Sequence, residues 1–249
     1  MKALITGASS GIGKDMARYL SELGFDLILV SREKEGLEQL KEELPTNVKN
    51  VIVDLSNEDK VKELFVALKN EDVDVLINNA GFGDAGYFNN TDLSKEINMI
   101  NVNVKAVHIL TKLFLKEMMK KNKGYILNVA SSAAFQPGPF MATYYSTKAY
   151  VLRLTQAISF ELKKQKSKVK ISCLCPGPTK TKFESVANVK FQMNEYSSQF
   201  VAHYAIDKMF DNKVVIIPGL KMKLSRFFGR FLSDRKIMKV IFNIQNKKF

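Results

Sequence analysis

Cysteine is scarce in this chain of 249 residues, and long apolar runs are missing from it. Its two cysteines, Cys173 and Cys175, are one residue apart without nearby metal-ligating partners, so we expect neither a disulfide framework nor a metal site, and a reduced, cytoplasmic setting. The longest apolar segments, such as 27–30 and 214–217, are far too short for a membrane-spanning helix. We expect no secretory signal peptide either, because a glycine turn at Gly7 leaves no room for its apolar region.

Acidic residues are also few: the chain has 25 of them and 38 lysines and arginines, which gives a net charge of +13. The excess is concentrated in residues 218–249, which hold nine basic residues and one acid. The overall composition, 46% hydrophobic and 25% charged, excludes collagen-like and wholly disordered chains. We therefore divide the chain into one mildly basic domain, 1–217, and a basic C-terminal extension, 218–249.

Short apolar segments alternate with amphipathic segments of helical length along most of the chain. Continuously apolar strands that alternate with helices indicate a parallel sheet with helices on both faces. The fold class predicted is therefore α/β: a single doubly wound, Rossmann-like domain with about seven strands. The predicted strands are Lys2–Thr6, Leu27–Val30, Asn50–Asp54, Val73–Ile77, Gly124–Ala130, Lys170–Cys175 and Val214–Ile217. The predicted helices are Ile12–Leu23, Glu33–Leu44, Glu58–Lys69, Ser94–Lys120 and Tyr144–Lys163.

A turn with three glycines joins the first predicted strand to the first helix. Glycines allow close backbone approach to a pyrophosphate, and the free N–H groups and dipole of the helix favour an anion. Such a turn can also merely connect two elements, but its place between strand and helix favours the phosphate site. The residues predicted to bind the nucleotide cofactor here are Gly7, Ser9, Ser10, Gly11, Ile12 and Gly13.

The end of the second predicted strand indicates which nucleotide is bound. Sites for NAD(H) usually place an acid there for the ribose 2′-hydroxyl, whereas this chain has Ser31 and Arg32. A guanidinium can bind a 2′-phosphate with two hydrogen bonds, so we favour NADP(H) over NAD(H), although Arg32 can also be a solvated residue of the helix start. Asp54, at the end of the third strand, is placed either to contact adenine or to stabilise the strand end.

Tyr144 and Lys148 are four residues apart on a predicted helix, so their side chains share one face. A phenol is a poor base at neutral pH, and a neighbouring ammonium would lower its pKa. Tyr145 is not equivalent, because Ala149 follows it at the same spacing.

Two serines, Ser131 and Ser132, follow the strand that ends at Ala130. They lie at the carboxyl edge of the predicted sheet, where ligands bind. A hydroxyl there can stabilise charge that develops on a substrate oxygen, and we expect one serine to do so while the other caps the turn.

Together these motifs resemble the short-chain dehydrogenase/reductase family over roughly residues 1–185. The resemblance rests on the segment from Thr6 to Gly13, on Asn78-Asn79-Ala80-Gly81 and on the Tyr144–Lys148 pair. It implies hydride transfer between a nicotinamide cofactor and a carbonyl or secondary alcohol. The catalytic residues that it implies are Asn103 rather than Asn101, Ser131 with Ser132 as the alternative, Tyr144 and Lys148.

The resemblance also extends the predicted cofactor site and suggests partners. Further cofactor-binding residues would be Asn79, Ala80, Gly81, Tyr144, Lys148, Pro176, Gly177, Thr179 and Thr181. The family commonly forms dimers or tetramers, so a homo-oligomer is expected. A non-catalytic NADP(H)-sensing or scaffold protein is the alternative function. A nucleotide-sugar epimerase is disfavoured because too few residues follow the sixth strand.

The C-terminal extension combines aromatic and basic residues at helical spacing over 220–242. Such a segment can contact an anionic membrane surface, cover the substrate cleft, pack on its own domain or meet another subunit, whereas nucleic acid is not expected. The segment 181–211 is predicted to form an apolar substrate lid, which suggests a lipophilic substrate. Its apolar residues are Phe183, Val186, Val189, Phe191, Met193 and Phe200. His108 and His203 are expected to be packed or solvated.

Overall fold

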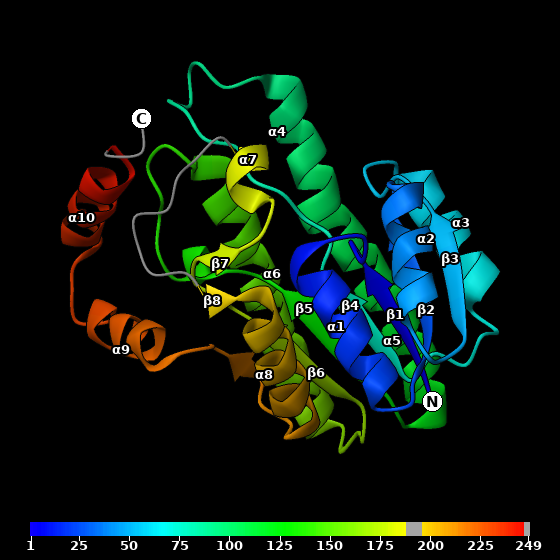
Figure 1. Ribbon diagram of the computed structural model, residues 1–249. Coiled ribbons are helices and arrows are strands. Elements are labelled where there is room, and N and C mark those ends of the chain that lie inside the picture. The colour runs from blue at the N-terminus through cyan, green and yellow to red at the C-terminus, as the bar shows by residue number, and fades with distance from the viewer. Residues whose placement is uncertain (188–195, 247–249) are drawn as a thin grey trace.

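A seven-stranded parallel sheet forms the centre of the computed structural model, which describes residues 1–187 and 196–246 (Figure 1). The strand order is β3-β2-β1-β4-β5-β6-β9, so the order reverses at β1, between β2 and β4. This confirms the predicted doubly wound fold, in which ligands bind at the carboxyl ends of the strands beside the reversal. The strands are β1 (Lys2–Thr6), β2 (Asp26–Ser31), β3 (Val48–Ile52), β4 (Val75–Asn78), β5 (Tyr125–Val129), β6 (Lys170–Leu174) and β9 (Val215–Ile216), and β7 (Thr179–Lys180) pairs with β8 (Tyr196–Ser197).

Helices connect the strands and continue beyond the last of them. The helices are α1 (Gly11–Glu22), α2 (Lys34–Glu43), α3 (Glu58–Leu68), α4 (Leu93–Ile100), α5 (Val107–Lys121), α6 (Ala142–Lys164), α7 (Phe183–Ala187), α8 (Ser198–Phe210), α9 (Leu220–Gly229) and α10 (Asp234–Asn246). A π-helical segment, Asn101–Ala106, and a short 3₁₀ helix, Ser132–Phe135, complete the set. Among the helices of these described residues, none has the length and hydrophobicity required to cross a bilayer.

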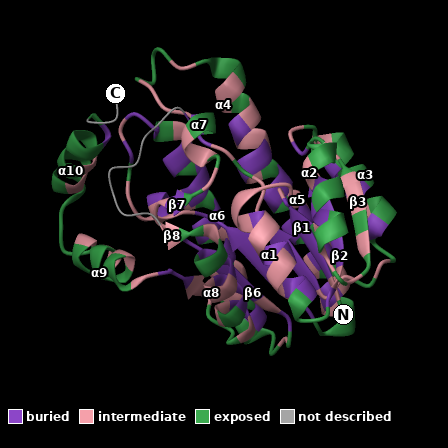
Figure 2. Ribbon diagram, in the orientation of Figure 1, coloured by how far each residue is buried: buried purple, intermediate pink, exposed green. Residues whose placement is uncertain are grey.

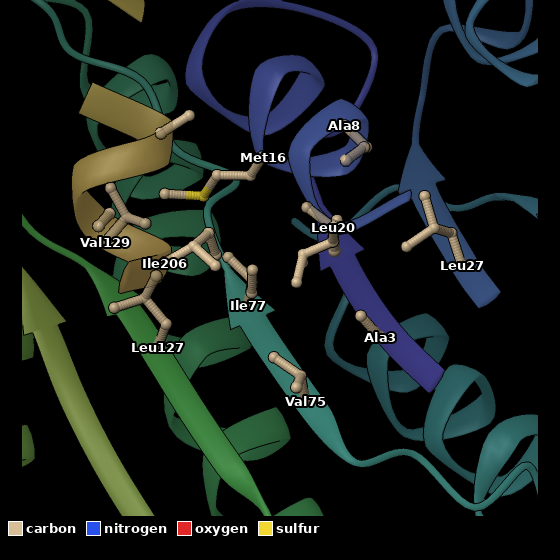
Figure 3. Close-up of a cluster of buried hydrophobic side chains, with 14 of the residues drawn as sticks. Ala3, Ala8, Met16, Leu20, Leu27, Val75, Ile77, Leu127, Val129 and Ile206 are labelled. Atoms are coloured by element: carbon tan, nitrogen blue, oxygen red, sulfur yellow. The ribbon is translucent and has the colours of Figure 1, made fainter. Parts of the chain in front are cut away.

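Two apolar layers hold the helices against the sheet. Helices α1, α2 and α8 cover one face, whereas α3, α5 and α6 cover the other. In the first layer, Met16 and Leu20 of α1 and Ile206 of α8 lie over Ile77 and Leu127 of the sheet (Figure 3). The purple strands and inner helix faces in Figure 2 show that burial follows these layers.

Helix α8 corrects part of the predicted lid. Its apolar residues Val201, Ala205 and Ile206 are fully buried against the sheet layer, and His203 stacks on Tyr19 of α1 at a centroid distance of 3.9 Å. The second half of segment 181–211 is therefore a core helix, because its apolar residues face the domain. Of the residues expected in the lid, Val189, Phe191 and Met193 lie outside the described residues.

The helix predicted over 94–120 contains a π-helical segment in its middle. Asn103 in this segment is fully buried, and its amide exchanges hydrogen bonds with the backbone of Phe82: Phe82 N–H donates to Oδ1 at 3.1 Å, and Nδ2 donates to the carbonyl at 2.9 Å. A wider helical turn places this amide toward the loop after β4. Hydropathy periodicity does not report such a local change in hydrogen bonding.

The C-terminal extension forms two helices instead of a single one over 220–242 (Figure 1). Helix α9 ends at Gly229, and α10 packs on the domain beside the carboxyl edge of the sheet. Phe242 of α10 contacts Phe140 with ring centroids 4.9 Å apart, and Gln245 is 4% exposed. The extension therefore belongs to the folded body.

Two glycine-to-alanine substitutions should have opposite effects on stability. A Cβ at Gly13 would lie 2.4 Å from the carbonyl oxygen of Gly7, so we expect Gly13→Ala to lower the free energy of unfolding by about 1–3 kcal/mol. A Cβ at Gly229 meets open space, so Gly229→Ala should leave stability unchanged or raise it by up to ~1 kcal/mol. Urea unfolding followed by circular dichroism measures both, and an equal loss in the two variants would contradict the packing described for the glycine turn.

Candidate active site

A cavity of about 570 Å³ opens at the carboxyl ends of the strands, where the strand order reverses. All residues predicted for the site line this cavity, except Gly13 and Asn103. Gly13 packs beneath the glycine turn. The predicted residues in its wall are Gly7, Ser9, Ser10, Gly11, Ile12, Ser31, Arg32, Asp54, Asn79, Ala80, Gly81, Ser131, Tyr144, Lys148, Pro176, Gly177, Thr179 and Thr181. Segments from both halves of the chain therefore meet in one cavity.

The glycine turn is held in place by the loop after β4. The Asn79 side chain donates from Nδ2 to the carbonyls of Thr6 and Gly7 at 3.0 and 3.1 Å. Gly7 and Gly11 have φ angles of +66° and +56°, which favour glycine. Ser10 makes no side-chain cap at the start of α1, so the first N–H groups of this helix remain available to an anion. These features fit the phosphates of a dinucleotide.

The end of β2 forms the edge of the same cavity. The Ser31 hydroxyl donates to Ser9 Oγ at 2.9 Å, which ties this strand end to the glycine turn. Arg32 is exposed and lines the cavity without a salt bridge to any residue that the structure describes. Hydrogen bonds from Ser56, helped by the charge of Arg32, hold the pKa of Asp54 below its ordinary value. This edge therefore offers the guanidinium of Arg32 and the carboxylates of Glu33 and Asp54 to a ligand.

Helix α6 carries Tyr144 and Lys148 into the interior, where both are buried. Lys148 Nζ donates to the carbonyl of Val129 at 3.0 Å and lies 5.8 Å from the centre of the Tyr144 ring. Burial lowers the pKa of Lys148 from 10.5 to about 8. Burial also raises the pKa of Tyr144 well above that of an ordinary phenol. The sequence led us to expect the opposite shift for Tyr144, but removal of water from this hydroxyl outweighs the hydrogen bond with Ser131, which lowers the pKa.

The two serines have different partners. Ser131 hydrogen-bonds with Tyr144, which opposes the rise in the pKa of that phenol, and its Oγ also accepts from the N–H of Ala133 at 3.1 Å. Ser132 begins the 3₁₀ helix and donates its backbone N–H to the carbonyl of Pro176 at 2.8 Å. Of the two serines, Ser131 is therefore the one whose hydroxyl pairs with the phenol, and its assignment as the catalytic serine stays a prediction.

Asn103 supports the site from behind its wall. Besides its two bonds to Phe82, its Nδ2 donates to Thr147 Oγ1 at 3.1 Å. A Cβ at Gly81 would lie 2.9 Å from Asn103 Oδ1 and 3.0 Å from Lys148 Nζ. The amide thus holds the Gly81 loop close to Lys148, and its expected role in binding a water molecule stays a prediction.

The loop after β6 closes one end of the cavity. Thr179 Oγ1 donates to the carbonyl of Gly177 at 3.0 Å, and Thr181 Oγ1 accepts from the N–H of Phe183 at 3.1 Å. Both threonines therefore stabilise the loop itself. Their expected contacts with nicotinamide stay predictions.

Sequence reasoning predicted only part of the opposite wall, which is mainly apolar: Phe183 and Val186 were expected in the lid, and covering the cleft was one alternative for the extension. The wall is formed by Phe82, Met141, Tyr145, Phe183, Val186, Met222, Ile241, Ile244 and Gln245. The last four come from the C-terminal extension, and Met222 lies so close to Gly177 that a Cβ there would be 2.3 Å from its Sδ. The spacing of Ile237, Ile241 and Ile244 was the available signal for an inward helix face, but it does not indicate what that face covers.

Comparisons with known proteins agree with this geometry. A family model described as short chain dehydrogenase matches residues 1–190. An uncharacterized oxidoreductase of Staphylococcus epidermidis is 30% identical over 181 residues, which cover 72% of this chain and 78% of that protein. The very-long-chain 3-oxoacyl-CoA reductase of Homo sapiens is 33% identical over 167 residues, covering 64% of this chain and 54% of that enzyme.

Among solved structures, a short-chain dehydrogenase from Sphingobium yanoikuyae in complex with NADPH has a TM-score of 0.83 and 27% sequence identity. The match covers 92% of this chain and 93% of that one. The glycine turn, the Asn78–Gly81 loop and the Tyr144–Lys148 pair all lie within the region that the family model matches, and they converge on one cavity. The chain therefore belongs to the short-chain dehydrogenase family of oxidoreductases.

Proposed function

We propose that this protein is an NADP(H)-dependent oxidoreductase that interconverts a carbonyl and a secondary alcohol on a lipophilic small molecule. The observation that carries the proposal is the continuity of one cavity from the glycine turn to the buried hydroxyl of Tyr144. At one end the cavity offers N–H groups to phosphates, and at the other it offers a proton donor. A pure sensor of the nucleotide has no need of the second end.

The cofactor would be held along the carboxyl edge of the sheet. The glycine turn would bind its phosphates, the ends of β2 and β3 would bind the adenosine part, and the loop after β6 would contact the nicotinamide. When bound, the nicotinamide supplies or accepts the hydride. The residues of the chain then have to orient the substrate oxygen and move one proton.

The proton comes from Tyr144 in the direction of reduction. Its raised pKa keeps the Tyr144 hydroxyl protonated at neutral pH, so Oη can donate to the oxygen of a carbonyl as negative charge develops there. Ser131 Oγ, which already pairs with this phenol, is placed to hydrogen-bond the same oxygen. The charge of Lys148 then stabilises the phenolate that remains. In oxidation the same groups work in reverse, with Tyr144 as the base.

Arg32 supports the preference for NADP(H). A carboxylate at the end of β2 would repel a 2′-phosphate, but this position holds the exposed guanidinium of Arg32 next to the Ser31–Ser9 hydrogen bond. Solved relatives of 27% identity contain NADPH in one case and NADH in another, so the preference rests on Arg32.

The outer face of the C-terminal extension supports peripheral contact with an anionic membrane. The ribbons of α9 and α10 are coloured mostly as exposed or intermediate (Figure 2), and both helices carry exposed large apolar side chains. Phe228 is 61% exposed and Phe231 74% exposed, on a segment rich in lysine and arginine. Aromatic residues among basic ones can insert at the headgroup level of an anionic bilayer. Such contact would suit a lipophilic substrate.

The long helices α5 and α6 support the proposal of a homo-oligomer. Phe160 of α6 is 62% exposed and Tyr150 is 39% exposed, so this helix presents apolar surface away from the sheet. Burial of that surface against a second copy would remove it from water.

Replacement of the proton donor should strongly reduce turnover. We expect Tyr144→Phe to lower the rate of NADPH oxidation with a panel of ketones by about 10²- to 10⁴-fold while NADPH still binds. Tyr150→Phe, on the exposed face of the same helix, should retain activity. Ser131→Ala should reduce turnover more than Ser132→Ala. If the unmodified chain binds NADPH but oxidises it with no ketone, the sensor or scaffold alternative is favoured.

Removal of the guanidinium at the β2 end should change cofactor preference. We expect Arg32→Ala to weaken NADPH binding by about 10- to 100-fold, because charge-assisted hydrogen bonds to the 2′-phosphate are lost, with little effect on NADH. Titration of cofactor fluorescence measures both affinities. Arg153→Ala, which removes an exposed arginine from α6, is the control and should change neither. Equal weakening of both cofactors by Arg32→Ala would refute the assignment.

Charges introduced on the outer face of α9 and the segment after it should prevent vesicle binding. We expect the unmodified chain to sediment with phosphatidylserine-containing vesicles at low salt and to be released at high salt. Phe228→Glu combined with Phe231→Glu should abolish sedimentation, whereas Leu23→Glu with Val66→Glu, at exposed positions outside the extension, should not. Membrane contact is ruled out if the unmodified chain stays in the supernatant at low salt.

A further inference from the structure

Gln245 near the end of α10 is buried in the apolar wall of the cavity with half of its amide unpaired. The residue is 4% exposed and lines the cavity, and its Nε2 donates to the Tyr145 hydroxyl at 2.9 Å. Its Oε1 is buried and has no hydrogen-bond partner among the residues that the structure describes. A buried amide oxygen without a partner is costly, so a polar ligand atom is the natural complement.

Tyr145 adds a second unused hydrogen-bonding position beside this oxygen. Its hydroxyl accepts from Gln245 and, within the described part of the chain, has no acceptor for its own proton. The pair therefore offers an acceptor, on Gln245 Oε1, and a donor, on the Tyr145 hydroxyl, beside the second N–H of the Gln245 amide. If the amide is rotated by half a turn, the tyrosine donates to Gln245 and the free positions exchange roles, but one donor and one acceptor still remain.

The pair is held rigidly at the cavity. Gly138 lies against the Tyr145 ring so closely that a Cβ there would be 2.3 Å from a ring atom. Helix α10 is fixed on the domain by the Phe242–Phe140 contact and by Ile241, which packs against the cluster that contains Tyr144 and Tyr145. Burial raises the pKa of Tyr145, so its hydroxyl stays neutral and keeps its proton.

We propose that the Tyr145–Gln245 pair is a second recognition site of this enzyme, which binds a hydroxyl group of the substrate apart from the reacting carbonyl. The inference rests on the proposed function, because it assumes that the carbonyl lies at Tyr144. A hydroxyl both donates and accepts, so it satisfies the two free positions at once. The rings of Tyr144 and Tyr145 have centroids 6.2 Å apart, so one small molecule can reach both. The substrate class is therefore a hydroxyketone, or the corresponding diol, with an apolar body.

Binding measurements without turnover test the pair separately from the reaction. The protein is Tyr144→Phe loaded with NADPH, titrated by calorimetry with propiophenone and β-hydroxypropiophenone, and with decalone and hydroxydecalone. We expect at least one hydroxylated ketone to bind about 10-fold or more tightly than its plain partner, because a site built for a hydroxyl rejects the analogue that lacks it. Ketone reduction by the chain with Tyr144 intact tests the proposed function independently.

Variants then assign this preference to the two residues. Gln245→Leu with Tyr145→Phe removes both polar groups, so no orphaned partner remains, and we expect it to abolish the preference for the hydroxyl while plain ketones bind as before. Gln136→Leu removes an amide elsewhere in the same cavity wall and should keep the preference. A role of the pair in folding alone would change both ketones equally. Equal affinity within every pair of ketones, or a preference that survives the double substitution, would overturn the proposal.

Discussion

The burial of a lysine that has no ion pair with any carboxylate of residues 1–187 and 196–246 is the constraint on which this site depends. Lys148 has the Val129 carbonyl as a hydrogen-bond acceptor, and its pKa is about 8 instead of 10.5. Because the unfolded chain holds this proton up to higher pH than the folded chain does, the group opposes folding below pH 8. That opposition disappears as the pH rises from about 8 to 10.5. The fold must therefore stabilise α6 by other contacts.

A buried polar network provides part of that stabilisation. Asn78 of β4 donates to Thr111 of α5 and to Asn128 of β5, and Asn128 donates to Thr155 of α6 at 3.0 Å. The network joins two central strands to the two long helices on one face, and it fixes α6 relative to the strand that ends beside Ser131. The Oδ1 atom of Asn78 is buried without a hydrogen-bond partner among the described residues, but the amide nitrogens of Asn78 and Asn128 are both paired, and any displacement would cost these bonds as well. The positions of Tyr144 and Ser131 follow from it.

Most of the fold and of the cofactor end of the site could be predicted because the signals there are local. Strand β1, the glycine turn and α1 are consecutive, and the four-residue spacing of Tyr144 and Lys148 places them on one helix face whatever surrounds it. Features that depend on distant contacts could not be predicted. The direction of the pKa shift of Tyr144 depends on how deeply the fold buries it, and the π-helical segment depends on the loop at Phe82. Helix α8 looked like a lid because its apolar residues do not reveal which surface they cover.

The C-terminal extension is the clearest case of a feature that sequence reasoning could not place, because its position depends on distant contacts. The family model ends at residue 190, whereas Met222, Ile241 and Gln245 complete the cavity wall. Under the function we propose, the shared region would carry out the reaction, and the segment beyond it would form part of the surface that the substrate contacts. In that segment one helix, α10, has an inward face that meets Tyr145 and an outward face that is exposed. Because positions on the two faces alternate along the helix, a substitution in α10 changes either the cavity wall, as at Ile241, Ile244 and Gln245, or the exposed surface, as at Val240.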